Sequence, residues 1–148
     1  MGSKLRTLSW VLLALVGALL LFGSLASAGV AYTSPSDQIG PISLEELAAG
    51  RADVRVALQA RRGTAAAFGA GYAVLVLLIV LVPYRRGEVW AWWAVLSGSL
   101  VSAGLVLVRI PALGTRLGLA GAFPLVVVVI ALLLDASRLK RTAAQPAV

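Results

Sequence analysis

The residues of this chain best placed for acid or base chemistry are two adjacent glutamates, Glu45 and Glu46. A glycosidase-like pair needs carboxylates that face one bond, whereas neighbouring positions on a helix point in different directions. Ser43 and Glu46 instead have the spacing of a capping box, in which both side chains bond to backbone N–H groups at the start of a helix. The pattern predicts a structural role for these carboxylates.

The most polar cluster inside an apolar stretch consists of Ser97, Ser99 and Ser102. These serines lack the neighbouring base that a serine nucleophile needs. We expect them to hydrogen-bond to carbonyls of their own helix or across one helix contact. The alternative is a small polar pocket in which Ser97 and Ser99 are joined by Tyr72.

The composition excludes several kinds of chemical site. The chain has no Cys and no His, which removes thiolate nucleophiles, thiolate metal sites and the side chain best suited to proton transfer near neutral pH. We therefore expect no catalytic, metal or cofactor site. The net charge of +7 comes from short basic groups at the ends of apolar runs, a pattern typical of membrane orientation and not of nucleic-acid binding.

Hydrophobic residues make up 60% of the 148 residues, above the roughly 45–50% of soluble domains. Apolar runs occupy residues 8–30, 64–84, 89–108 and 117–134, each near the roughly 20 residues that a bilayer-spanning helix needs. The last three runs are joined by short connections, which make successive helices antiparallel neighbours. The sequence predicts one all-α integral membrane domain over residues 1–148, a four-helix transmembrane bundle.

The first apolar run has two interpretations. Lys4 and Arg6 precede it, and Ala26-Ser27-Ala28 fits the cleavage pattern of a secretory signal peptide. The apolar core of a signal peptide is usually about 7–15 residues long, and this run is longer. We expect the segment to be retained as a span, with cleavage as the alternative.

Residues 32–63 form the predicted extracytoplasmic loop, which begins with turn formers. After the capping box, Leu44, Leu47, Val54 and Leu58 recur at helical spacing, which predicts a short amphipathic helix outside the membrane. The second spanning helix should begin near Asp53, because an acidic residue suits the positive end of a helix, whereas a start at residue 64 would leave two arginines there.

A basic and aromatic hairpin follows the second run. Tyrosine and tryptophan prefer the headgroup level, and arginines after a span anchor it and suit the negative helix end. We expect interfacial anchoring here, with binding of an anionic lipid headgroup as the alternative. The residues concerned are Arg85, Arg86, Trp90, Trp92 and Trp93.

Together with Leu44-Glu45-Glu46-Leu47 and Arg61, the stretch Arg85-Arg86-Gly87-Glu88-Val89-Trp90-Ala91-Trp92-Trp93 resembles a family of small, functionally uncharacterised bacterial membrane proteins with four predicted spans. The resemblance covers most of the chain in layout. It implies the same fold and no particular activity, so it carries no catalytic residues to this chain.

Small residues recur at every fourth position in each apolar run, which allows helix backbones to approach closely in a membrane. We expect Gly69, Gly98, Ser102 and Gly118 to lie at helix contacts. An Ala- and Gly-rich chain also produces such spacings by chance, so each single stripe has that alternative explanation.

The basic residues around the first run predict the orientation. Lys4 and Arg6 precede it, and the next basic residue is Arg51, with Asp37, Glu45 and Glu46 between. Basic residues favour the cytoplasmic side of a membrane. We therefore expect a multi-pass protein of a bacterial inner membrane with both termini in the cytoplasm.

No Asp, Glu, Lys or Arg falls near the middle of a predicted span, whereas proton relays, ion-coupled carriers and voltage sensors use such charged groups. We predict a non-catalytic structural or accessory membrane component whose partners are membrane lipid and either another membrane protein or a second copy. One alternative is a binder of a lipophilic small molecule, a lipid or a quinone, within the bundle. Another is a membrane-embedded enzyme acting on lipid headgroups.

Overall fold

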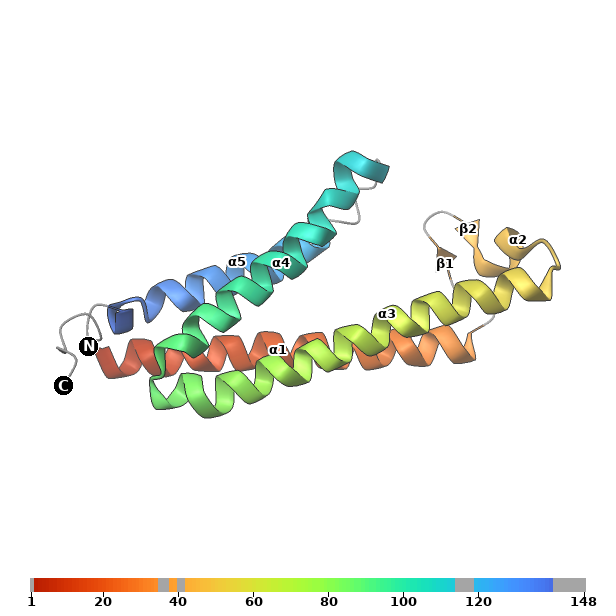
Figure 1. Cartoon of the computed structure of the whole chain (residues 1–148). Helices are drawn as coiled ribbons and strands as arrows, with labels where there is room; N and C mark the ends of the chain where they lie inside the picture. The colour runs from red at the N-terminus through yellow and green to blue at the C-terminus, as the bar shows by residue number, and fades with distance from the viewer. Residues whose placement is uncertain (1, 35–37, 40–41, 114–118, 140–148) are drawn as a thin grey trace. The chain divides into compact units, whose positions relative to one another are not determined.

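The computed structural model describes residues 2–34, 38–39, 42–113 and 119–139 (Figure 1). Within them the chain is mostly helical, with short turns between helices. One antiparallel hairpin pairs Gln38 with Ser43 and Ile39 with Ile42. The elements are α1 (Gly2–Thr33), β1 (Gln38–Ile39), β2 (Ile42–Ser43), α2 (Leu44–Ala48), α3 (Ala52–Ile79), the π-helical turn η1 (Val80–Tyr84), α4 (Val89–Leu113) and α5 (Leu119–Leu134).

Three helical segments in the described part of the chain are long and apolar enough to cross a membrane: Lys4–Thr33, Ala52–Tyr84 and Val89–Ala112. A shorter apolar helix, Phe123–Leu134, follows them. The whole of α5 has 16 residues and rises about 24 Å at 1.5 Å per residue, against roughly 30 Å of hydrocarbon. The predicted all-helical character is confirmed, with three candidate membrane spans where four spans were predicted. The start of the predicted fourth span lies outside the described residues.

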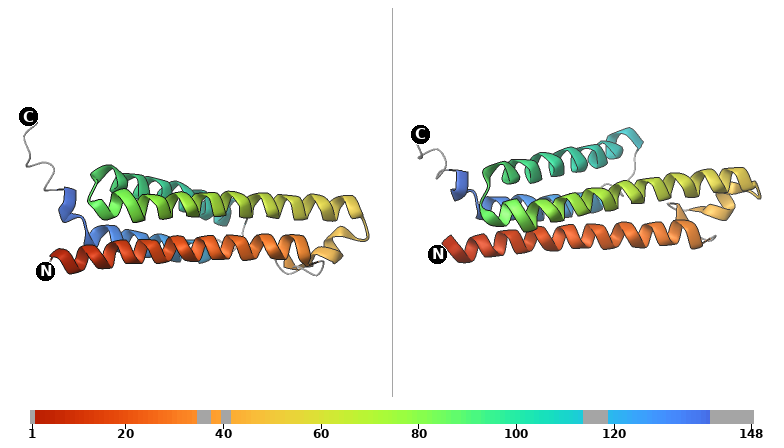
Figure 2. Two further views of the ribbon diagram at one scale, coloured as in Figure 1. Left: turned by 90° about the horizontal axis from the view of Figure 1, so that it is seen from below. Right: turned by 60° about the horizontal axis from the view of Figure 1, so that its bottom comes forward.

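The chain divides into two compact units, one formed by Met1–Gly17 with Leu75–Val148 and the other by Ala18–Val74. In the first unit, α4 and α5 lie side by side and antiparallel (Figures 1 and 2). Its core contains aliphatic side chains from all of its helices: Leu13, Val16, Val80, Ala91, Val95, Val128, Ala131 and Leu132.

The second unit contains the later part of α1, the hairpin, α2 and most of α3. Small residues on α3 meet α1 closely, because an added Cβ at Gly69 would lie 2.6 Å from Ser24 Oγ and one at Gly63 would lie 2.1 Å from the Tyr32 hydroxyl oxygen. Gly69, one of the predicted packing residues, thus lies close to Ser24 of α1.

The start of α3 confirms the prediction from charge, because the helix begins at Ala52 with Asp53 in its first turn. The preceding helix is shorter than expected. α2 has five residues and ends where Ala49 and Gly50 take positive φ angles of 46° and 77°. The later part of the predicted amphipathic stripe, Val54 and Leu58, therefore belongs to α3.

Pro83 explains the π-helical turn η1, which was not predicted from the sequence. In a regular α-helix its ring would crowd the carbonyl of Ile79, and it has no N–H to donate. The helix widens into η1 at this point, and the Arg85 N–H bonds to the Val80 carbonyl. This wider turn ends the second candidate span at Tyr84.

Candidate functional site

The principal polar site in the described chain is built around the C-terminal end of α5. The last carbonyls of a helix have no partner within it. Ser9 of α1 donates its hydroxyl to the Ala131 carbonyl at 2.7 Å, and the Trp92 indole N–H of α4 donates to the Leu132 carbonyl at 3.1 Å. Side chains of two other helices therefore complete the end of α5.

A second hydrogen bond links α1 to the end of η1. The hydroxyl oxygens of Ser9 and Tyr84 lie 2.7 Å apart, and both side chains are fully buried. Ser9 shares a face of α1 with the buried Leu13 and Val16, as residues four and seven positions apart do on a helix. Packing along this face therefore positions the serine hydroxyl.

A buried ion pair lies in the turn after α5. Asp135 and Arg138 pair through Oδ2 and Nη2, and both side chains are 7% exposed. The guanidinium carbon of Arg138 also lies 4.2 Å from the centroid of the Tyr84 ring, and Nη1 donates to the Glu88 carbonyl at 3.3 Å. Arg138 thus connects the end of α5 to the turn before α4.

The turn between η1 and α4 is held from α1 as well. Arg6 donates to the Arg85 carbonyl at 2.9 Å, and the Arg85 guanidinium lies 4.9 Å from the centroid of the Trp10 ring. Gly87 has a φ of 99°, and a Cβ there would lie 2.7 Å from Arg6 Nη2. Glycine is therefore required both by the backbone conformation and by the arginine.

We call these residues the capping cluster, since most of them occupy backbone carbonyls near helix ends. In Figures 1 and 2 the beginning of α1, the turn from η1 to α4 and the end of α5 meet at one end of the first unit. Its members are Arg6, Ser9, Tyr84, Trp92, Asp135 and Arg138.

The cluster's hydrogen bonds favour a structural role over a reactive one. The Ser9 hydroxyl already contacts two oxygen atoms, and the Asp135 carboxylate is paired with Arg138. Across the described residues, no group of three His, Cys, Asp or Glu side chains is arranged to hold a metal ion. The arrangement fastens three helices and a turn together.

The predicted aromatic and basic hairpin is divided by the structure. Arg85, Arg86, Trp90 and Trp93 are exposed, as interfacial anchors would be. Trp92 is instead 7% exposed, because its indole bonds to the end of α5. Only four of the five expected anchors therefore face outward.

The residues of the predicted polar pocket lie on α4 and α3. Ser97 is exposed and bonds to the Ala94 carbonyl of its own helix at 3.3 Å, which agrees with our first expectation for the serines. Ser99 is partly buried on α4, in the first unit, and Tyr72 is partly buried on α3, in the second.

The remaining predicted packing residues differ in their surroundings. Gly98 is partly buried on α4. Ser102 is exposed, because this helix turns Ala103 inward at that level. Gly118 lies outside the described residues.

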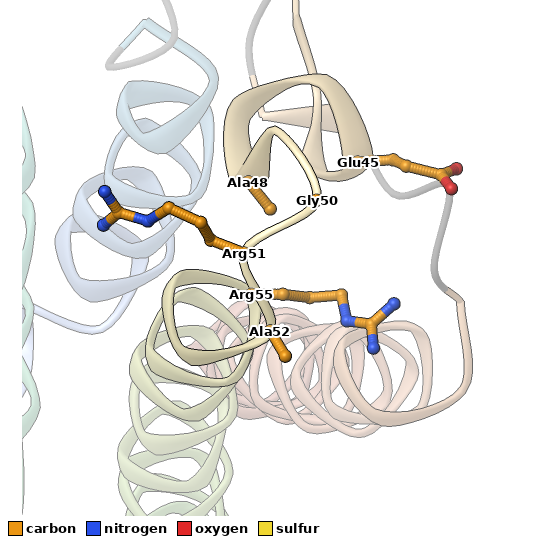
Figure 3. A pocket seen from close by; sticks show the side chains of 6 residues that line it. All are labelled: Glu45, Ala48, Gly50, Arg51, Ala52 and Arg55. Carbon is orange, nitrogen blue, oxygen red and sulfur yellow. The ribbon is translucent and has the colours of Figure 1, made fainter.

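A small pocket of about 90 Å³ lies in the second unit where α2 meets α3 (Figure 3). Its charged side chains, Glu45, Arg51 and Arg55, extend in different directions and do not converge on one point. Arg51 lies 3.8 Å from Asp53 in an exposed ion pair. The capping box beside it is formed as predicted: the Ser43 N–H donates to a Glu46 carboxylate oxygen at 3.0 Å, and the Glu46 N–H donates to Ser43 Oγ at 3.1 Å.

Most of the capping cluster was not predicted from the sequence. Two signals for it are visible in retrospect. Asp135 and Arg138 have the i, i+3 spacing of a helical ion pair just after the last apolar run, and Ser9 is a polar residue on the face that carries Leu13 and Val16. Neither signal identifies the partner helix, because the contacts join residues 75 and 122 positions apart.

No protein-family model, curated protein or solved structure matches this chain. The resemblance based on the hairpin at residues 85–93 therefore stays a prediction.

Proposed function

We propose that this chain is a four-span protein of a bacterial plasma membrane that acts by association, as a non-catalytic structural or accessory component. One observation carries the proposal. Among the described residues, the buried charged side chains are Asp135 and Arg138, and they neutralise each other. A charged group within a bilayer has a high free-energy cost and usually serves transport or catalysis. This pair instead lies in the turn after α5 and stabilises that turn.

The outer surface of the spans supports the membrane assignment. Large apolar side chains are exposed along every long helix, which suits contact with lipid and not with water. The most exposed are Leu19, Phe22, Phe68, Leu105 and Phe123. Helix contacts such as the one between Gly69 and Ser24 use close approach in place of hydrophobic burial.

The proposal is tested by comparing packing variants with carboxylate variants in cells that lack the native gene. Gly69→Leu should separate α1 from α3 and abolish complementation of any growth defect at equal protein level. Glu45→Gln and Asp53→Asn should complement fully, because neither carboxylate has a chemical role in the proposal. If the carboxylate variants fail while Gly69→Leu succeeds, the protein acts chemically and the proposal is wrong.

A further inference from the structure

An open groove of about 300 Å³ lies where the second candidate span ends, and Leu81, Val82, Arg85 and Arg86 line it. All of these side chains are exposed. The two aliphatic residues belong to the span Ala52–Tyr84, and the two arginines directly follow it. The groove therefore has an apolar wall toward the membrane and a cationic end beyond it.

The cationic end of the groove is formed by Arg85 and Arg86. Within the described part of the chain, no carboxylate lies within ion-pair distance of Arg85 or Arg86. The nearest acidic residue in sequence, Glu88, accepts a hydrogen bond from the Trp90 indole instead. Arg85 is held in place over the Trp10 ring, with 4.9 Å between guanidinium carbon and ring centroid. The Arg85 guanidinium is thus oriented, and Arg86 forms no ion pair among the described residues.

Guanidinium groups bind phosphate oxygens through parallel N–H donors. Free phosphate would use the cationic end alone, whereas a phospholipid also places an acyl chain on Leu81 and Val82. A zwitterionic headgroup carries its own cation, so two unneutralised arginines favour a lipid with net negative charge. We propose that this groove binds one anionic phospholipid, its phosphate between Arg85 and Arg86 and its chain along the aliphatic wall. The inference rests on the membrane location proposed above.

The experiment uses the full chain in phosphatidylcholine vesicles and measures tryptophan quenching by brominated lipid. Trp93→Phe is introduced first, because this side chain is exposed and would report on general lipid contact. Trp90 is kept, because its indole holds the Glu88 carboxylate. Trp10 beneath Arg85 then reports on the groove, and Trp90 and the buried Trp92 give the same background in every variant. We expect brominated phosphatidylglycerol to bind about five times more tightly than brominated phosphatidylcholine, in line with two interfacial arginines.

The variant Arg85→Gln/Arg86→Gln should bind the two lipids equally. The control Arg51→Gln/Arg55→Gln removes the same charge from exposed positions on or next to α3 and should keep the fivefold preference. Circular dichroism confirms that both variants are helical. The proposal is overturned if the first variant keeps its preference, or if the control loses it equally.

Two further measurements separate the sources of failure. Excess inorganic phosphate should leave the quenching unchanged, and displacement by it would assign the groove to a soluble anion. Resistance of the reconstituted protein to alkaline carbonate extraction tests membrane insertion. An inserted protein with no lipid preference contradicts only the lipid site, whereas an extractable protein contradicts the proposed function as well.

Discussion

The hydroxyl groups of Ser9 and Tyr84, which are 75 positions apart in sequence, lie 2.7 Å apart in the interior of the first unit. Ser9 also donates to the Ala131 carbonyl, so one small side chain joins α1, η1 and α5. In an apolar interior each of these polar groups would be costly without a partner. The serine therefore contributes to stability mainly by satisfying its neighbours.

Ser9→Ala should lower the free energy of unfolding by roughly 0.5–2 kcal/mol, since it leaves the Tyr84 hydroxyl and the Ala131 carbonyl with fewer partners. The measurement is denaturation in mixed micelles, followed by circular dichroism. Ser97→Ala is the matched control, because that serine is exposed and bonds only within its own helix among the contacts described. Equal stability of the two variants would contradict the prediction.

Gly69→Leu should destabilise the second unit by about 1–3 kcal/mol, because a larger side chain must displace Ser24 or the backbone of α1. Even a Cβ at this position would lie 2.6 Å from Ser24 Oγ. Gly71→Leu, two residues along the same helix, meets nothing within 4 Å and should leave the unfolding midpoint unchanged or raise it. A shift of the same size in both variants would show that glycine matters here for backbone flexibility and not for packing.

The fold followed from the sequence to the extent that it depends on local patterns. Apolar runs marked the long helices, and the Asp53 charge located the beginning of α3. The capping box at Ser43 was equally local, since both of its hydrogen bonds join residues three positions apart. These features depend on periodicity and helix-end electrostatics, which a single sequence carries.

The capping cluster depends on information of another kind. In the sequence, Trp92 cannot be distinguished from its exposed neighbours, because the carbonyl that its indole binds belongs to α5. Ser9 likewise cannot be distinguished from the other small residues of its apolar run. η1 was missed because Pro83 stands where a span could simply have ended. Each of these features depends on which helix lies opposite, and tertiary neighbours are not encoded by spacing along one helix.

The α2 cap should weaken in acid. Hydrogen bonds from the Ser43 backbone N–H and then its hydroxyl lower the pKa of Glu46 below the ordinary glutamate value. A carboxylate with a lowered folded-state pKa adds stability that is fully present above the ordinary pKa and is lost as the pH falls through the folded one. Amide hydrogen exchange over Leu44–Ala48 should therefore accelerate, relative to its intrinsic rate, in that acidic window. Glu46→Gln keeps an acceptor but cannot titrate, so its relative exchange should not change there; persistence of the acid effect would refute this cause.

The predicted orientation places the beginning of α1 in the cytoplasm and α2 outside. The chain has no native cysteine, so a single introduced thiol reports its own location. Ser3→Cys should be protected from a membrane-impermeant maleimide in intact spheroplasts, and Glu45→Cys should react, because basic residues precede the first span and acidic ones follow it. The reverse labelling pattern would mean that the N-terminus lies outside and α2 lies in the cytoplasm.

The Asp135 and Arg138 pair should respond very differently to single and double replacement. Asp135→Asn leaves the buried Arg138 without its counter-charge, and removing one partner of a buried pair costs about 3 kcal/mol or more. Arg138 keeps its contacts with the Tyr84 ring and the Glu88 carbonyl, which restrains the arginine but does not neutralise it. Asp135→Asn/Arg138→Gln removes both charges together, so its loss of unfolding free energy should be smaller than that of the single variant. Denaturation of the three proteins in the same micelles measures this difference. A double variant that is less stable than Asp135→Asn would mean that Arg138 stabilises the turn chiefly through Tyr84 and Glu88, and that charge neutralisation is the lesser of its two roles.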